Sequence, residues 1–143
     1  MITYSLVPFD EIADFVARNA EQHYDDLLED TGEKHAKINW EYYLNASAIE
    51  RCKAVVAYDD EQPVGYSWYT INNDPLHRDK WMAYSQALWV HKDYRNKVDI
   101  IKEAEIGLKK LGIDEIVYIF GNEKLCRLMK MNGYKQKQIV WSK

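Results

Sequence analysis

The sequence predicts an α/β domain, and three stretches carry this prediction. Residues 81–112 contain an apolar run (81–90), a polar turn (91–97) and an amphipathic helical pattern that ends at Gly112. Residues 115–120 form an unbroken apolar run, which is typical of a strand buried on both faces. Two β-rich runs, 53–58 and 63–72, flank the polar residues 59–62 and predict a hairpin. The strand–helix–strand order from 81 to 120 favours a right-handed parallel crossover.

The N-terminal third predicts one strand and three helices. Residues 2–7 read as a strand that Pro8 ends, and the next helix has a face at helical spacing formed by Ile12, Phe15, Val16 and Asn19. The acidic stretch 21–33 predicts a short second helix and a loop, and Gly32 suits the helix end. Asn39 suits the N-cap of a third helix over 40–48.

The remaining segments complete the predicted order. Residues 72–75 break the second hairpin strand, so we expect a loop to about Lys80. Residues 122–131 predict a helix that Asn132 and Gly133 stop, and residues 135–142 predict a last strand. The order is therefore β-α-α-α-β-β-β-α-β-α-β. We expect one domain, 1–143, because a chain of this length builds a single core.

Composition narrows the class of function. The net charge is -4 and the pI is about 5.6, which argues against nucleic acid as the main partner. The N-terminus has no signal-peptide pattern and no run is long enough to span a membrane, so we expect a cytoplasmic protein. Cys52 and Cys126 lack metal or redox spacing and are expected to be reduced and buried. The four histidines show no ligand spacing, so no metal is expected.

The turn after residue 90 has the arrangement of an anion site. A strand, a polar turn and a helix N-terminus offer backbone N–H groups to a negatively charged ligand. The turn also carries cationic side chains, which are Lys92, Arg95 and Lys97.

Two local motifs connect this pattern to a known family. Residues 90–95 read VHKDYR and resemble the "V-x-P-x-Y-R" that ends the fourth strand of GNAT-superfamily, acyl-CoA-dependent N-acetyltransferases. Residues 122–134 read NEKLCRLMKMNGY and resemble the family's "N-x-x-A-x-x-L-Y-x-x-x-G-F". The resemblance covers essentially the whole chain. Within the family, the chain is similar to short, glycine-poor members encoded by bacteriophages.

This resemblance implies a fold and a cofactor site. The sheet would be mixed, mostly antiparallel and six- to seven-stranded, and helices would flank it. Its parallel strands, about 81–90 and 115–120, would splay around the pantetheine arm of acetyl-CoA. Main-chain contacts to that arm would come from Leu88, Trp89 and Val90. Asn122 would lie near the arm, and the pyrophosphate turn would comprise Arg95, Asn96, Lys97, Val98, Asp99 and Ile100.

The chain also departs from the family pattern. Val98 and Ile100 replace both glycines of the pyrophosphate turn, and Asp99 places a negative charge where an anion would bind. Met129 stands at the position of the usual tyrosine acid.

The catalytic groups that remain near this strand are a tyrosine and a histidine. Tyr84 is the candidate acid, and His91 is the candidate base because histidine titrates near neutrality. Gln86 cannot act as a base but could position a water. Transfer within a ternary complex relies heavily on proximity, so it tolerates a weak acid or base.

Three functions follow as alternatives. The first is transfer of acetyl from acetyl-CoA to an amine of a small molecule or a protein. The second is a non-catalytic GNAT-like module, a phage virion or host-interaction component that would assemble with itself or another protein. The third and weakest is binding of another acyl thioester, or of a peptide that adds a strand at the splayed edge.

Overall fold

The computed structural model describes residues 1–28, 38–118 and 123–135. Its elements in chain order are β1 (Ile2–Pro8), α1 (Phe9–Leu28), α2 (Trp40–Ala48), β2 (Cys52–Asp59), β3 (Gln62–Asp74), β4 (His77–Val90), the 3-10 turn η2 (Lys92–Tyr94), α3 (Ile100–Lys110), β5 (Glu115–Val117) and α4 (Glu123–Met131).

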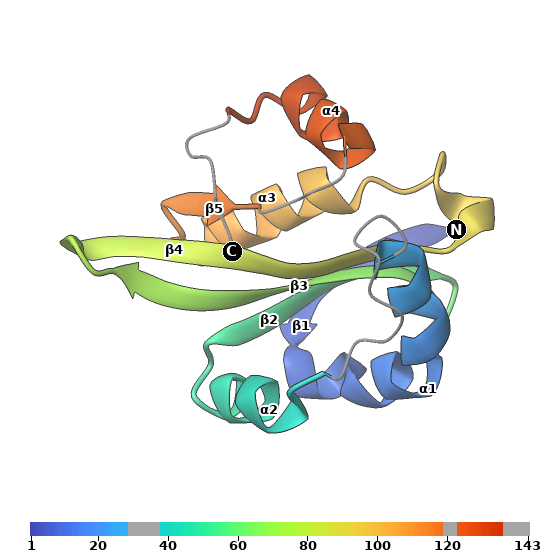
Figure 1. Cartoon of the computed structure of the whole chain (residues 1–143), viewed down its shortest axis with the longest axis horizontal. Helices are drawn as coiled ribbons and strands as arrows, with labels where there is room; N and C mark the ends of the chain where they lie inside the picture. The colour runs from blue at the N-terminus through green and yellow to red at the C-terminus, as the bar shows by residue number, and fades with distance from the viewer. Residues whose placement is uncertain (29–37, 119–122, 136–143) are drawn as a thin grey trace.

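A mixed sheet forms the middle layer of the molecule. Its strands lie in the order β1-β2-β3-β4-β5, in which the first four are antiparallel neighbours and β5 is parallel to β4. Helices α1 and α2 cover one face, and α3 and α4 lie over the other (Figure 1). The predicted α/β class and the parallel strand pair are therefore confirmed.

The core between the sheet and α1 and α2 is strongly aromatic. Phe9 and Val16 of α1 are fully buried against the even-numbered residues of β3, Tyr66 and Trp68. The Phe9 and Trp68 ring centroids are 5.0 Å apart. Asn39 caps α2 as predicted, since its side chain accepts the N–H of Tyr42 at 3.1 Å. This face uses much of the aromatic content that the composition shows.

Two apolar clusters lie on the opposite face. Ala104 and Leu108 of α3 pack over Val55 and Tyr69. Ile100 and Ile101, at the start of α3, pack with Leu88 of β4 and Met129 of α4. The start of α3 is thus attached to the same end of β4 that precedes it in the chain.

Two sequence predictions are wrong. Residues 21–28 continue α1 and do not begin a second helix. The loop predicted up to Lys80 is a tight hairpin instead, because β4 begins at His77. The Asp74 carboxylate accepts the Leu76 N–H at 2.9 Å and the His77 Nδ1 lies 3.0 Å from it, which closes the turn within the strand pair.

Other predictions differ in their bounds or are not tested. The helix predicted from residue 98 begins at Ile100. The described part of the chain forms five strands. The last strand predicted over 135–142 falls almost entirely outside the described residues, as do residues 119 and 120 of the strand predicted over 115–120 and the end of the acidic stretch. No helix in the described ranges is long and apolar enough to cross a membrane.

Candidate functional site

The edge of β4 opens where β5 ends. Among the described residues, β5 pairs with Met82, Ala83 and Tyr84, whereas β4 continues to Val90. The β3–β4 register shifts between Trp68 and Tyr69, which leaves Gln86 as an extra residue on β4. Such a bulge bends a strand and ends its regular pairing. The described residues therefore confirm a parallel pair that is short and then gives way to an unpaired β4 edge.

Alternation of the backbone decides which groups face this edge. The His91 N–H bonds to the Val64 carbonyl of β3 at 2.8 Å. In an antiparallel ladder the backbone groups of successive residues point to opposite sides, so those of Leu88 and Val90 point away from β3. Those of Trp89 point toward β3. Two of the three main-chain contacts predicted for a pantetheine arm are thus directed outward, and the third is used within the sheet.

The turn after β4 is held by its own backbone. The Lys97 and Val98 N–H groups both bond to the Tyr94 carbonyl, at 2.8 and 3.1 Å. The Asp99 N–H bonds to the Tyr4 hydroxyl at 3.0 Å, and the Asp99 carboxylate accepts the Lys102 N–H at 3.1 Å. Asp99 is therefore the N-cap of α3.

The residues that replace glycine pack into the core. Ile100 is 2% exposed, and Val98 is partly buried against the same cluster. Among the described residues, a positive φ occurs at four positions, none of them in the turn: Glu50, Asp60, Gly112 and Gly133. The turn is built without a conformation that requires glycine, and its branched side chains attach it to the sheet.

The cations of the turn are only partly available. The Arg95 Nε lies 3.5 Å from the outward-facing Val90 carbonyl, so this side chain folds back toward β4. The Lys97 ammonium lies 5.6 Å from the centre of the Tyr94 ring. Lys92 and Asn96 are exposed.

A carboxylate connects this turn to the N-terminus. The Tyr94 hydroxyl donates to the Asp59 carboxylate at 2.6 Å, and the Met1 ammonium lies 3.2 Å from the same carboxylate. The hydrogen bond from Tyr94 and the contact with the N-terminal ammonium lower the pKa of Asp59. The same carboxylate, followed by that of Asp60, raises the pKa of the Met1 ammonium.

The structure separates the two candidate catalytic residues. Tyr84 lies beside the end of β5, and His91 follows the last residue of β4. At about 3.3 Å per residue, seven positions along a strand span roughly 20 Å. Only one of these two side chains can therefore lie at a reacting centre. The His91 Nδ1 accepts the Asp93 N–H at 3.2 Å, which gives His91 a role in capping η2.

A chain of hydrogen bonds joins α2, β4 and β3 at the bulge. The Tyr43 hydroxyl donates to Gln86 Oε1 at 2.9 Å, and Gln86 Nε2 donates to Thr70 Oγ1 at 3.2 Å. Gln86 Nε2 also lies 3.1 Å from the Tyr84 carbonyl. Gln86 is exposed, so α2 and the bulge together present polar groups on the α1–α2 face of the open edge.

Tyrosine hydroxyls lie on the other face of the same edge. The Tyr69 and Tyr118 hydroxyls are 2.6 Å apart, and the ring centroids of Tyr118 and Tyr134 are 5.4 Å apart. Burial is the main reason that the pKa of each is raised, that of Tyr134 to about 12. Tyr118 and Tyr134 pack against the cluster that contains Met129, which is 7% exposed. Met129 thus acts as a core residue where the family has its acid.

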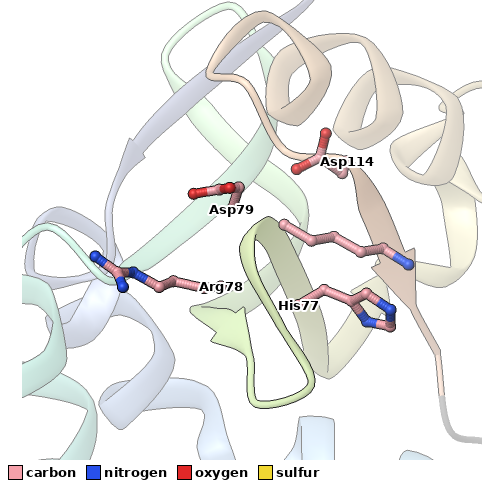
Figure 2. Close-up of a pocket in the computed structure, with 5 residues that line it drawn as sticks. His77, Arg78, Asp79 and Asp114 are labelled. Carbon is pink, nitrogen blue, oxygen red and sulfur yellow. The ribbon is translucent and has the colours of Figure 1, made fainter.

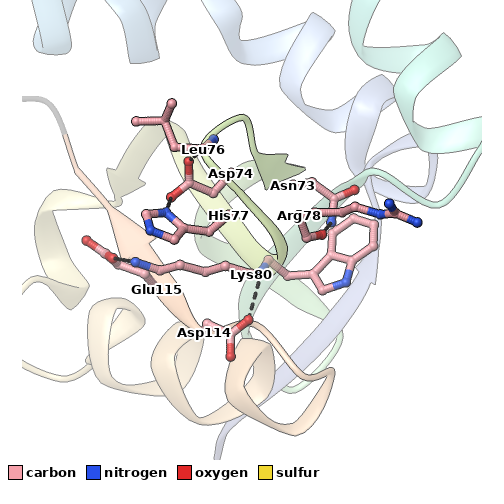
Figure 3. Close-up of polar contacts among 9 residues, drawn as sticks. Asn73, Asp74, Leu76, His77, Arg78, Lys80, Asp114 and Glu115 are labelled. Carbon is pink, nitrogen blue, oxygen red and sulfur yellow. Dashed lines mark hydrogen bonds and ion pairs between the residues drawn. The ribbon is translucent and has the colours of Figure 1, made fainter.

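A pocket lies elsewhere, at the β3–β4 hairpin. It has a volume of about 530 Å³ and is lined by His77, Arg78, Asp79, Lys80 and Asp114 (Figure 2). Lys80 pairs with Glu115 at 2.7 Å, and Asp114 accepts the Trp81 N–H at 2.7 Å (Figure 3). These contacts attach the start of β5 to β4. The pocket is about ten residues, roughly 30 Å along the strand, from Val90.

No group of three or more metal-ligating side chains is found in the part of the chain that the structure describes. Cys52 is fully buried, and burial raises the pKa of its thiol to about 12. Asn122, which the resemblance places near the cofactor arm, lies outside the described residues.

Sequence reasoning missed three features of this site. The bulge at Gln86 has no glycine or proline to mark it. The contact between Tyr4 and Asp99 joins residues that are 95 positions apart. The tyrosine group depends on Tyr69 of β3 and on Tyr118, which directly follows β5, and these residues are 49 positions apart in the chain.

Comparison with known proteins gives one family. The model of the Acetyltransferase (GNAT) family matches residues 19–134. No curated protein sequence matches the chain.

Solved structures agree with the family at the level of the fold. An aminoglycoside acetyltransferase from an uncultured soil metagenomic sample, in complex with trehalose, has a TM-score of 0.71 at 13% identity, covering 99% of this chain and 94% of its own. A predicted acetyltransferase of Clostridium acetobutylicum, solved with acetyl-CoA, has a TM-score of 0.70 at 15% identity, covering 99% and 95%. A ribosomal-protein-alanine N-acetyltransferase of Brucella melitensis biovar Abortus 2308 has a TM-score of 0.67 at 13% identity, covering 99% and 98%.

Proposed function

Because the chain belongs to the GNAT acetyltransferase family, we propose that it is an N-acetyltransferase that moves an acetyl group from acetyl-CoA to an amine by direct transfer. In this reaction an N–C bond forms while the C–S bond of the thioester breaks. The amine nitrogen releases a proton, and the sulfur takes one up. The amine belongs to a small molecule or a protein, in line with the aminoglycoside and ribosomal-protein acetyltransferases that share the fold.

The unpaired edge of β4 is the observation that carries this proposal. Beyond the bulge, the Leu88 N–H points away from β3 at the free edge of β4, where it can donate to a carbonyl oxygen. A fixed backbone donor at this point stabilises negative charge that develops on the oxygen during transfer. The Val90 N–H points the same way and can hold an amide of an extended ligand.

Proton transfer is assigned to residues at the bulge. Tyr84 adjoins the end of β5, where its hydroxyl is our candidate for protonating the leaving sulfur. Gln86 is fixed by Tyr43 and Thr70 and is proposed to orient the amine or a water that removes its proton. His91 remains the alternative base, at the far end of β4.

Calorimetry and turnover test the proposal together. Acetyl-CoA is titrated into the protein, and a panel of small-molecule and peptide amines is then incubated with both and examined by mass spectrometry for added acetyl groups. We expect binding and acetylation of at least one amine. No heat at millimolar acetyl-CoA together with no acetylated product would rule the proposal out.

One observation favours a second candidate, a GNAT-fold module without catalysis. The α3 N-terminus is occupied by the chain's own Asp99 carboxylate and Tyr4 hydroxyl, which is unexpected for an anion site in use. In this alternative the fold serves as a scaffold or an interaction surface. Its phage-associated form, a virion or host-interaction component, rests on the sequence resemblance alone. Turnover of acetyl-CoA with any amine in the panel would count against it.

A further inference from the structure

The N-terminus of α3 already holds an acid. The Asp99 Oδ1 accepts the Lys102 N–H at 3.1 Å, a position in which the oxygen of a bound phosphate would otherwise lie. A carboxylate there satisfies the helix and repels a second anion. Asp99 is exposed, so this repulsion acts on any ligand that approaches from solvent and is weakened by salt.

Half of the backbone donors of the turn 95–100 are also used. Tyr94 accepts the N–H groups of Lys97 and Val98, and Tyr4 accepts that of Asp99. In the first helical turn, only Ile100 and Ile101 have N–H groups without an acceptor among the described residues. Both of their side chains are buried in the core, so the backbone here is fixed in place.

Two of the turn's cations make contacts with the protein itself. Arg95 reaches back toward the Val90 carbonyl, and Lys97 lies over the Tyr94 ring. A diphosphate therefore meets a carboxylate, a turn in which half of the N–H groups are already bonded, and two cations that already have contacts within the protein.

The β4 edge offers the opposite conditions. The outward N–H groups of Leu88 and Val90 are uncharged donors, and among the described residues β5 pairs with β4 no further than Tyr84. Pantetheine is a chain with two amides, and such a chain can pair with a strand edge in the manner of an added strand. This edge can hold a thioester without any contact to phosphate.

We infer that this chain binds its acyl donor through the pantetheine arm and not through the diphosphate. The inference rests on the proposed function and narrows it. The ligand class is pantetheine thioesters, with or without a nucleotide, and the nucleotide diphosphate adds little affinity because Asp99 and Tyr4 occupy its place.

Comparing two donors tests the inference. The dissociation constants of acetyl-CoA and of S-acetyl-pantetheine, which lacks all phosphates, are measured by calorimetry at low salt. We expect values within about threefold, whereas two or more charge-assisted hydrogen bonds to a diphosphate would favour acetyl-CoA by about 100-fold or more. A preference above about 30-fold would overturn the inference while supporting the proposed function. If neither thioester binds, both are wrong.

A charge-neutral variant isolates the role of Asp99. Asparagine is an equally good N-cap, so Asp99→Asn keeps the helix start and removes the charge. We expect acetyl-CoA to bind about 3- to 10-fold more tightly at low salt, with S-acetyl-pantetheine unchanged, since only the diphosphate is repelled. Asp79→Asn, an exposed carboxylate at the distant hairpin, is the matched control and should change neither constant. Equal effects on both donors, or no effect on acetyl-CoA, would contradict the inference.

Discussion

At the scale of single residues, Asp59 connects the N-terminus to the turn that follows β4. Its pKa is lowered chiefly by the Tyr94 hydroxyl, so it stabilises the fold at pH values above its unfolded pKa near 3.8, and this stability is lost as pH falls through the lower folded value. The contribution of the Met1 ammonium to stability depends on pH in the opposite direction. Its pKa is raised above 8.0, so its contribution is complete below pH 8 and is lost as pH rises through the folded value.

Asp59→Asn should remove both pH dependences. We expect the stability difference between wild type and variant to be largest between about pH 5 and 7 and to shrink toward both extremes. Urea unfolding at a series of pH values measures this difference, and Asp79→Asn serves as a control for the loss of a carboxylate. Parallel pH profiles for wild type and Asp59→Asn would contradict the assignment.

The separation of Tyr84 and His91 gives a second prediction. Tyr84→Phe removes only a hydroxyl, and we expect kcat for amine acetylation to fall by about 10- to 100-fold if this hydroxyl protonates the sulfur. His91→Gln should leave kcat within about threefold, because the two side chains are separated by roughly 20 Å along β4. The pH profile of kcat distinguishes an acid from a structural residue, since only loss of an acid changes its shape. The reverse ranking of the two variants would transfer the catalytic role to His91.

At the scale of elements, Gly65 keeps β3 close to the end of β4. A Cβ at this position would lie 3.1 Å from the Trp89 carbonyl oxygen and 3.5 Å from Ile100 Cδ1. The first of these atoms belongs to the backbone of β4, so neither strand can give way without moving the open edge. By contrast, a Cβ at Gly107 of α3 would make ordinary contacts with Leu6, the nearest at 3.6 Å.

The two glycines should therefore respond in opposite directions to alanine. We expect Gly65→Ala to lower the free energy of unfolding by about 1–3 kcal/mol through overpacking. Gly107→Ala should be neutral or stabilising by up to about 1 kcal/mol, since alanine is the better helix former. Urea unfolding monitored by tryptophan fluorescence gives both values. A Gly65→Ala protein as stable as wild type would show that β4 can shift at no cost.

Local signals account for the elements that the sequence predicted well. Asn39 and its neighbours define a helix start by themselves, and the apolar run 115–120 predicted a strand beside residues 81–90. The failures occurred where a local signal was ambiguous. The acidic residues after Glu21 predict a new helix but continue α1, and Asp74-Pro75 predicts a loop although an aspartate here closes a tight turn.

Long-range contacts explain what the sequence could not predict of the site. Asp99 is of a residue type that suits a helix start, but nothing local places the Tyr4 hydroxyl on its N–H. Val98 and Ile100 replace both glycines of the family's turn. Their side chains pack into the cluster below α3, which only the tertiary structure shows.

At the scale of the whole molecule, the proposed donor site is a gap between two parts of one sheet. The strands β1 to β4 are each paired along most of their length, whereas β5 pairs with three residues of β4. Backbone N–H groups that face an unpaired edge exchange with solvent faster than those within a ladder. The exchange rates of β4 amides thus report directly on the gap.

We expect the Leu88 and Val90 amides to exchange at least about tenfold faster than the Trp89 amide, because only the latter points toward β3. Adding S-acetyl-pantetheine should slow exchange at Leu88 and Val90 and leave Trp89 unchanged, as only the outward groups can donate to the ligand. Hydrogen exchange followed residue by residue by NMR measures all three amides in one experiment. Equal rates in the free protein would mean that the edge is covered. Unchanged rates on adding the thioester would favour the non-catalytic module, since a donor held at this edge must protect the groups that bind it.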